Sequence, residues 1–435
     1  MTARPTIGVD FGTTNTVVSL TTAAGEAQLV RFAGLGEDRA PFRSALSFHG
    51  DGDHSHGRRI EAGPWAIDAY LDDPGETRFI QSFKSYAASA LFSETTIFGR
   101  RYRFEDMLSA FLLQLRGHAG ETLGTLPPRL IVGRPVRFVG AKPDAALALT
   151  RYETAFRRLG FEEIFYAYEP VAAAFFFAKR LKADATVLVA DFGGGTSDFS
   201  ILRFERRGGA IKAIPLGQAG VGVAGDAFDY RIIDHLVSPQ LGKGSSYRDY
   251  DNILPIPIRY YAAFARWDQL ALLRASREMR DIRGLVRKAI EPDKIRKLVE
   301  VLDGEYGYPL YQSVSRLKEA LSAGETARFA FHAGEVSIER EVERGEFETW
   351  IDKELTAIEI ALDEAMASAG LAPGAVDHVF LTGGSSFVPA VRRIFADRFG
   401  EAKLDSGAEL ESIAAGLALM GGESDLSPWC QQAAG

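Results

Sequence analysis

Two stretches of the chain decide the fold: IGVDFGTTNTVVSL at Ile7–Leu20 and VADFGGGTSDFSIL at Val189–Leu202. Both contain the triplet Asp-Phe-Gly, first at Asp10–Gly12 and again at Asp191–Gly193. In each copy a turn of small residues follows the triplet, and a β-prone apolar run follows the turn. Each copy therefore predicts a strand, a tight turn and a second strand. The repetition predicts two related lobes, each built on its own sheet.

Helical patterns alternate with the strands. Apolar residues recur at helical spacing over Glu105–Leu115, and the helical pattern of Ala145–Leu159 follows the strand-like run Leu130–Val136. Pro170 suits the first turn of a helix that continues through VAAAFFFAKRL. Near the end, His378–Gly384 predicts a buried strand, and FVPAVRRIFADRF and ESIAAGLALM predict helices. This alternation predicts an α/β protein.

We expect each lobe to consist of a core and an inserted subdomain. The predicted boundaries are lobe I at 1–183 (core 1–33 and 127–183, insertion 34–126), lobe II at 184–404 (core 184–228 and 323–404, mainly helical insertion 229–322), and 405–435 as a helix returning to lobe I and a short tail. The second insertion differs from the rest of the chain in composition, because it is rich in Arg, Tyr and Trp.

Composition excludes several functional classes. The 435 residues include 50 Lys and Arg against 58 Asp and Glu, a net charge of −8, so we expect no nucleic-acid or membrane partner. Cys430 is the only cysteine, which excludes an internal disulfide framework and a cysteine-based zinc site. No apolar run reaches the length of about 18 residues typical of a membrane helix, and no apolar leader is evident. We expect a soluble, cytoplasmic protein.

The two turns have the composition of phosphate-binding hairpins. Gly12–Thr14 would expose backbone amides and hydroxyls at one point, which suits phosphate oxygens. Asp10, just before this turn, can act on phosphate only through a cation such as Mg²⁺ or its waters. Asp191 and the turn Gly193–Thr196 repeat the arrangement. One such turn alone would be read as an ordinary glycine hairpin, but two matching copies could hold a nucleoside triphosphate from both sides.

With these motifs the chain resembles the ATPase domain of the heat shock protein 70 (DnaK-type) chaperones, within the actin–hexokinase superfamily. The segments that carry the resemblance are IGVDFGTTNT, YEPVAAAFFFA, VADFGGGTSDFSIL, AGDAFD and FLTGGSSFVPAV, in family order over nearly the whole chain. The resemblance implies a two-lobed actin-like (ribonuclease H-like) fold with a deep central nucleotide cleft. It also implies ATP or ADP with Mg²⁺ as ligands, and slow ATP hydrolysis.

The resemblance implies catalytic roles for five residues. Asp10 and Asp191 would hold hydrated Mg²⁺, and Glu169 would orient water or relay motion between the lobes. Lys84 would point at the γ-phosphate, and the attacking water would lie near Thr196. Two simpler readings stay open: Glu169 as a carboxylate at a helix N-terminus, and Lys84 as a solvated surface lysine. The expected nucleotide-binding residues are Gly12, Thr13, Thr14, Asn15, Gly193, Gly194, Gly195, Gly225, Asp226, Lys318, Ser322, Gly383, Gly384, Ser385 and Phe387.

The predicted adenine site departs from the family pattern. The segment SRLKEALSAG keeps Lys318 and Ser322 but has Glu319 where the family has arginine. After the turn Gly383–Ser386, Phe387 replaces a second arginine. A phenyl ring can stack on adenine, whereas Glu319 cannot replace a cation. We therefore expect nucleotide affinity or base preference to differ from the family's.

The sequence says least about the protein partner and about what ATP binding would change for that partner. The chain ends at DLSPWCQQAAG, so we expect a short stand-alone member of the YegD type without a peptide-binding domain. An unknown protein partner would read ATP-dependent opening and closing of the lobes. Two other functions stay open: a small-molecule kinase with Asp198 or Asp10 as base, and a non-hydrolysing nucleotide-sensing scaffold. The partner surface, or alternatively the core of a larger helical subdomain, could use Tyr247, Tyr250, Tyr260, Tyr261 and Trp267.

Overall fold

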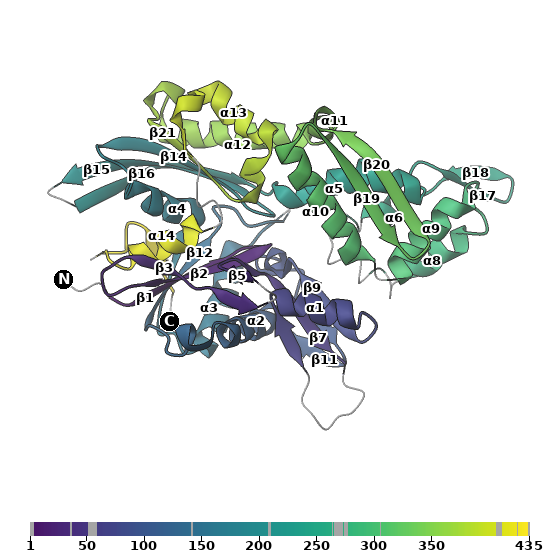
Figure 1. Ribbon diagram of the computed structural model, residues 1–435, viewed down its shortest axis with the longest axis horizontal. Coiled ribbons are helices and arrows are strands. Elements are labelled where there is room, and N and C mark those ends of the chain that lie inside the picture. Colours follow the sequence, from purple (N-terminus) through teal and green to yellow (C-terminus); the bar gives the residue numbers. More distant parts are fainter. Residues whose placement is uncertain are drawn as a thin grey trace. The chain divides into compact units, whose positions relative to one another are not determined.

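The computed structural model divides the chain into two compact units (Figure 1). Unit 1 comprises Met1–Val223, Ala357–Ser386 and Arg392–Gly435, and unit 2 comprises Ala224–Thr356 and Phe387–Val391. The structure describes all residues except 1–3, 35–36, 51–58, 141, 208–209, 263, 265–272, 274–276, 305, 406–410, 424 and 434–435. The mixed α/β class predicted from the sequence is confirmed.

The first sheet of unit 1 grows from the first motif hairpin. Its strands, in spatial order, are β23 (Cys430–Gln432), β13 (Glu163–Tyr168), β12 (Arg129–Arg134), β1 (Thr6–Phe11), β2 (Asn15–Thr21) and β3 (Ala27–Leu29), with β6 (Phe42–Arg43) paired to β2. β1 and β2 are antiparallel, as predicted, while β1, β12 and β13 run parallel. The edge strand β23 was not predicted: the expected tail adds to β13 as an antiparallel strand.

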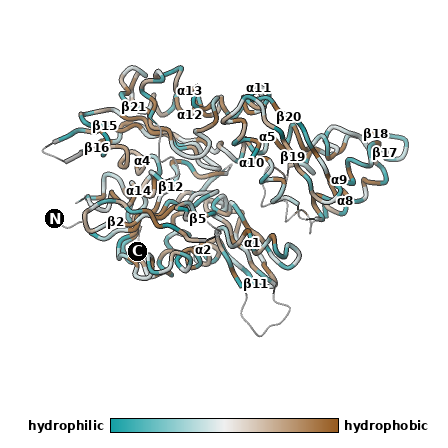
Figure 2. The backbone as a smooth tube through the Cα atoms, in the orientation of Figure 1, coloured by the Kyte–Doolittle hydropathy of each residue, from teal (hydrophilic) through white to brown (hydrophobic). Residues whose placement is uncertain are grey.

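The second sheet of unit 1 grows from the second motif hairpin. Its strands, in spatial order, are β16 (Ala210–Val221), β15 (Ser197–Arg207), β14 (Ala185–Phe192), β21 (His378–Thr382) and β22 (Leu404–Asp405). β14 is buried along its whole length, which is typical of a central strand covered on both faces. Hydrophobic residues run along the strands of both sheets (Figure 2).

Two apolar helices of unit 1 pack between the sheets. α4 (Glu169–Ala178) and α14 (Ser412–Met420) lie against each other; α14 packs on β1 and β2, and α4 packs on β14 and β15. Pro170 lies in the first turn of α4, as predicted, where a missing backbone N–H costs no helical hydrogen bond. Because α4 follows β13 directly, its first residue, Glu169, is delivered to the space between the two motif hairpins.

The remaining elements of unit 1 form smaller sheets and covering helices. They are β4 (Phe32–Gly34), β5 (Glu37–Arg39), β7 (Ala45–His49), β8 (Ile60–Ala62), α1 (Pro64–Asp72), β9 (Thr77–Gln81), β10 (Thr95–Ile97), β11 (Arg100–Tyr102), α2 (Phe104–His118), α3 (Ala145–Arg158), α13 (Pro389–Phe399, entering from unit 2) and 3₁₀ turns at Phe83–Tyr86, Gly120–Leu123, Pro373–Ala375, Gly384–Phe387 and Glu401–Lys403. α2 and α3 pack together and close an aromatic core around Phe11.

Unit 2 is mainly helical. Its elements are α5 (Gly225–Ile232), a π-helical turn (Ile233–Val237), a 3₁₀ turn (Ser238–Leu241), β17 (Ser246–Asp249), β18 (Asn252–Pro255), α6 (Arg259–Ala262), α8 (Arg277–Leu285), α9 (Pro292–Asp303), α10 (Gly307–Ala323), β19 (Thr326–Ala333), β20 (Val336–Glu343), α11 (Arg344–Trp350) and the start of α12 (Asp352–Ala369). The β17–β18 hairpin was not predicted.

The aromatic residues expected for a partner surface are divided. Tyr260 and Tyr261 are 4% and 1% exposed, so these two belong to the core of unit 2 and not to its surface. Tyr250 is 91% exposed, and Trp267 lies outside the described residues. The predicted lobe boundaries stay a prediction. The two compact units are divided differently, with 184–223 in unit 1. No described helix has the length and hydropathy of a membrane span.

Candidate active site

The two motif hairpins end in turns of the same construction. In the first, the Gly12 amide donates to the Asn15 carbonyl at 3.0 Å; in the second, the Gly193 amide donates to the Thr196 carbonyl at 2.9 Å. Asp10 and Asp191 precede these turns at the ends of β1 and β14. The internal repeat seen in the sequence therefore has the same turn hydrogen bond in both copies.

The two turns lie next to each other within unit 1. A Cβ atom placed on Gly195 would lie 3.5 Å from Thr13 Oγ1 and 2.8 Å from a methyl group of Val139. The small residues of both turns, with the Thr13 hydroxyl, therefore lie close together. Such a convergence of small residues and N–H groups is the arrangement that anion-binding backbone uses for phosphate.

Lys84 and Glu169 form a buried ion pair beside these turns. Lys84 lies in the 3₁₀ turn after β9, and its Nζ donates to Glu169 Oε1 at 2.8 Å. The two side chains are only 9% and 6% exposed, so the reading of Lys84 as a solvated lysine is wrong. Burial alone would lower the pKa of Lys84, but Glu169, Tyr152 and Asp10 raise it, and the ammonium stays charged.

Three aspartates complete a carboxylate cluster, which we define as Asp10, Glu169, Asp191 and Asp198. Burial raises the pKa of Asp10 to about 7, with Glu169 adding to the shift and Lys84 opposing it. Burial, followed by the other three acids, raises the pKa of Asp191 well above its usual range. Among the described residues these four carboxyl groups face the one ammonium group of Lys84, so ionising all four would leave an excess of negative charge that a bound cation would balance.

Asp198 is the most deeply buried member of the cluster. It is 0% exposed, and it accepts hydrogen bonds from the Arg137 amide at 3.1 Å and from the Thr196 hydroxyl. Burial raises its pKa to about 7, with Glu169 adding to the shift. Its Oδ2 atom has no hydrogen-bond partner among the described atoms. The sequence had suggested Asp198 only as a base in the kinase alternative.

The donor set of the cluster fits a hydrated Mg²⁺. Mg²⁺ takes oxygen ligands and usually keeps several waters, with one or two carboxylates and substrate phosphates beside them. Over the part of the chain that the structure describes, no three His, Cys, Asp or Glu side chains are grouped as direct ligands of an ion. The unpartnered Asp198 oxygen, and carboxyl groups that would ionise when a cation binds, suit a metal ion whose own waters span the remaining gaps.

Two residues of this site were missed by sequence reasoning. A Cβ atom on Gly133 of β12 would lie 3.1 Å from Glu169 Cγ, so a side chain here would press on Glu169. A glycine inside an otherwise apolar strand could have indicated such a close approach. Tyr152 of α3 is fully buried, and its hydroxyl has no partner among the described residues. Burial raises the pKa of this hydroxyl, with Lys84 opposing the shift and Glu169 adding to it. No local sequence pattern indicated that Tyr152 would belong to the site.

The predicted Gly383–Ser385 turn contacts the second phosphate turn. Gly383 has φ +82°, and a Cβ there would lie 2.1 Å from the Phe192 carbonyl oxygen. The Ser385 hydroxyl donates to the Gly193 carbonyl at 3.5 Å. The strand end of β21 is thereby held against that of β14. The structure brings Gly383 and Ser385 together with Gly193, as a shared nucleotide site requires.

The other predicted nucleotide-binding residues belong to unit 2. Gly225 and Asp226 begin α5, whereas Lys318 and Ser322 lie on α10. Lys318 Nζ lies 2.8 Å from Asp229 Oδ1 and donates to the Gly225 carbonyl at 3.5 Å. This lysine therefore neutralises a buried aspartate. Phe387 is 55% exposed. Contact of these residues with a nucleotide stays a prediction.

A comparison with known protein families gives an independent result. Residues 83–247 and 306–425 match the family model described as Hsp70 protein. These segments cover more than half of the chain and include Lys84, Glu169, Asp191 and the Gly383–Ser385 turn. The hairpin of Asp10 precedes them.

Proposed function

Because the chain belongs to the Hsp70 protein family, we propose that it binds Mg·ATP at the carboxylate cluster and hydrolyses it slowly, as a chaperone-like ATPase. Family membership supports ATP binding and ATPase activity in general. The observation that carries the assignment to this site is the buried Lys84–Glu169 pair beside Asp10 and Asp191. A charged ammonium among buried carboxyl groups is what the transfer of a phosphoryl group needs.

Two aspartates of the cluster would position the metal ion. Asp10 and Asp191 would hold the waters of Mg²⁺, and the backbone of Gly12–Thr14 and Gly193–Thr196 would surround the phosphates. When bound, Mg²⁺ neutralises phosphate charge and orients the phosphoryl group. Without a cation, burial and mutual repulsion keep the pKa of both aspartates raised.

The remaining groups would position the reaction. Glu169 fixes the direction of the Lys84 ammonium through the 2.8 Å hydrogen bond, so the lysine meets the γ-phosphate without reorganisation. The Thr196 hydroxyl donates a hydrogen bond to Asp198, which leaves a lone pair of the Thr196 oxygen to accept a hydrogen bond from the attacking water. Phosphoryl transfer depends mainly on positioning and charge neutralisation, and these groups supply both.

The output would be a change in lobe closure that a protein partner reads. The cluster takes residues from both sheets of unit 1 and from α4 between them, so loss of the γ-phosphate would alter contacts on both sides. The exposed Tyr250 and Ile253 of the β17–β18 hairpin support a partner surface in the 229–322 segment.

Isothermal titration of the protein with ATP tests the proposed site. We expect binding of one ATP that weakens at least about tenfold when EDTA removes Mg²⁺, or when Asp191→Asn removes a charge. Asp397→Asn, an exposed position on α13, is the matched control and should bind like the wild type. Equal ATP binding by all three proteins, with and without Mg²⁺, would overturn the assignment.

A separate turnover assay distinguishes the alternative function: ATP turnover that requires an added metabolite would favour the small-molecule kinase.

A further inference from the structure

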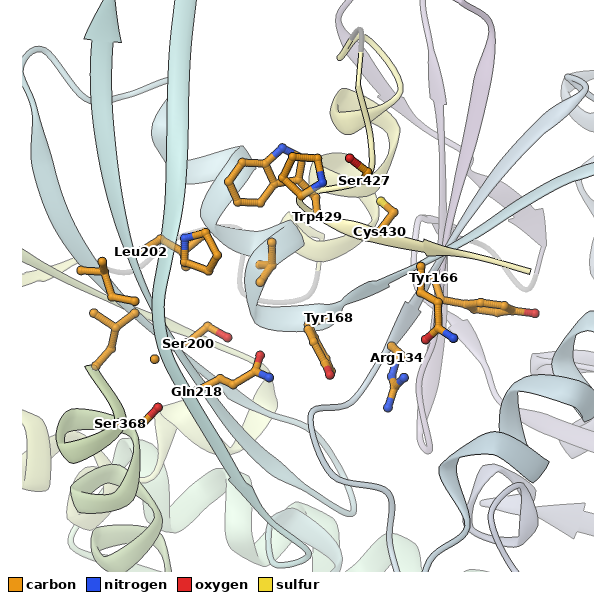
Figure 3. A pocket seen from close by; sticks show the side chains of 17 residues that line it. Arg134, Tyr166, Tyr168, Ser200, Leu202, Gln218, Ser368, Ser427, Trp429 and Cys430 are labelled. Atoms are coloured by element: carbon orange, nitrogen blue, oxygen red, sulfur yellow. The ribbon is translucent and has the colours of Figure 1, made fainter. Parts of the chain in front are cut away.

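Unit 1 contains a cavity that none of the four residues of the carboxylate cluster lines. It measures about 460 Å³, in the range of small-molecule sites, and none of its lining residues is among the predicted nucleotide-binding residues. Its walls come from both sheets, from α4 and α12, and from the C-terminal tail (Figure 3). In that view the polar side chains of Arg134, Tyr168, Gln218 and Ser200 lie below Trp429 and Ser427.

Arg134 gives this cavity its charge. It is the only charged residue among the described lining residues. Its guanidinium carbon lies 4.9 Å from the ring centre of Tyr168 and 5.6 Å from that of Phe138, and Nε donates to the Pro135 carbonyl at 3.4 Å. No ion pair joins Arg134 to any described carboxylate. An arginine held between aromatic rings, with N–H groups left over, is prepared to bind an anion.

Two polar side chains from neighbouring strands add directional groups. Ser200 of β15 and Gln218 of β16 face each other in the sheet register, and both line the cavity. Ser200 is 2% exposed, yet its hydroxyl has no hydrogen-bond partner among the described atoms. A buried hydroxyl without a partner costs free energy unless something that enters the cavity satisfies it.

The rest of the lining is apolar. Leucine, isoleucine, valine and proline side chains from α4, β15 and β16 form one wall, and Trp429 and Cys430 form another. Burial raises the pKa of the Cys430 thiol to about 12, so this group stays neutral. Trp429 is held in place by an edge-to-face contact with Phe175, with ring centres 5.3 Å apart. A ligand therefore needs an apolar body as well as an anionic group.

We infer that this cavity binds a small amphipathic organic anion, whose carboxylate-like group lies against Arg134 and whose apolar body lies against Trp429. The guanidinium would pair with the anionic group. Ser200 and Gln218 would hydrogen-bond to polar atoms of the ligand, and the aliphatic wall would take its body. The inference is independent of the proposed ATPase activity, because it rests on no residue of the carboxylate cluster.

Titration with anilinonaphthalenesulfonate, an apolar aromatic anion, tests this inference on the full chain. We expect saturable binding of one molecule, with energy transfer from tryptophan that falls when Trp429 is replaced by Phe. Arg134→Gln should weaken binding at least about tenfold, since a hydrogen-bonded charge pair is lost. Arg180→Gln, at an exposed arginine two residues after α4 that does not line the cavity, is the matched control and should bind like the wild type. Octanoate should displace the probe, whereas octylamine should not.

Equal dissociation constants for Arg134→Gln, Arg180→Gln and the wild type would overturn the inference, as would equal displacement by octanoate and octylamine. If Arg134→Gln lowers the melting temperature, Gln218→Glu replaces it. This isosteric change places a negative charge in the cavity at an exposed position of the edge strand β16, and it should also weaken binding about tenfold. Unchanged binding by Gln218→Glu would equally contradict the inferred site.

Discussion

The ammonium of Lys84 lies 2.8 Å from Glu169 Oε1, with both side chains almost fully buried, yet the two partners are not equivalent. Among the described residues, Lys84 is the one cation whose charge acts on Asp10, Asp191 and Asp198 as well as on Glu169. Glu169 is one of those four, and its charge raises the pKa of Asp10, Asp191 and Asp198. Removing the lysine therefore leaves uncompensated charge, whereas removing the glutamate charge also relieves repulsion.

This asymmetry predicts unequal losses of stability. Lys84→Met should lower the free energy of unfolding by about 3–5 kcal/mol, the usual cost of breaking a buried ion pair from one side. Glu169→Gln should cost less than half as much, because the amide still accepts from Lys84 and the repulsion falls. Urea unfolding in EDTA measures both. Lys179→Met, at an exposed position, is the control. A loss for Glu169→Gln as large as that for Lys84→Met would contradict this account of the cluster.

The raised pKa values predict how stability depends on pH. Asp10 and Asp198 have a pKa of about 7 in the folded protein against 3.8 when unfolded, so the folded state holds more protons between these values. Their contribution to stability is complete below about pH 4 and is lost as the pH rises through 7. In EDTA, the fall in melting temperature from pH 5 to pH 8 should be smaller for Asp198→Asn than for the wild type.

Mg²⁺ and ADP should reverse this trend, since they bind the ionised cluster. Their stabilising effect should increase from pH 5 to pH 8 as the aspartates lose their protons. Identical pH profiles for the wild type and Asp198→Asn would mean that Asp198 does not titrate in this range. A ligand effect that shrinks with rising pH would place the bound cation elsewhere.

Replacing Phe387 should change nucleotide affinity without changing the stability of the fold. Its side chain is 55% exposed, so Phe387→Ala should leave the melting temperature within about 2 °C of the wild type. If the ring stacks on adenine, the same change should weaken ATP binding by about tenfold or more, and titration calorimetry measures it. Leu91→Ala removes another exposed apolar side chain and is the control. Unchanged ATP affinity would show that Phe387 does not contact the base.

The sequence predicted what local patterns encode. The two hairpins, the helix that begins near Pro170 and the strand before Gly383 all follow from periodicity, turn residues and proline placement. The repeat of Asp-Phe-Gly then placed Asp10 and Asp191 at equivalent strand ends. These features depend on a few neighbouring residues, so one chain suffices to find them.

What the sequence did not predict depends on distant contacts. The tail strand β23 exists because its backbone pairs with β13, far away along the chain. Tyr152 joins the site because its ring packs edge-on against Phe11 of β1, with ring centres 5.9 Å apart, and no sequence motif surrounds it. From the sequence alone, Tyr260 and Tyr261 could belong to the surface or to the core. Their burial depends on packing against other elements. The ion pair of Lys84 likewise depends on a partner on another element, which a weak local match could not reveal.

Single-turnover hydrolysis of radiolabelled ATP with Mg²⁺ tests the central claim most directly. The wild type should release phosphate slowly, Asp397→Asn should release it at the same rate, and Asp191→Asn should be at least about a hundredfold slower because charge stabilisation at the cluster is lost. ATP that stays bound and uncleaved for hours in the wild type, or release at the wild-type rate by Asp191→Asn, would contradict an ATPase centred on the carboxylate cluster.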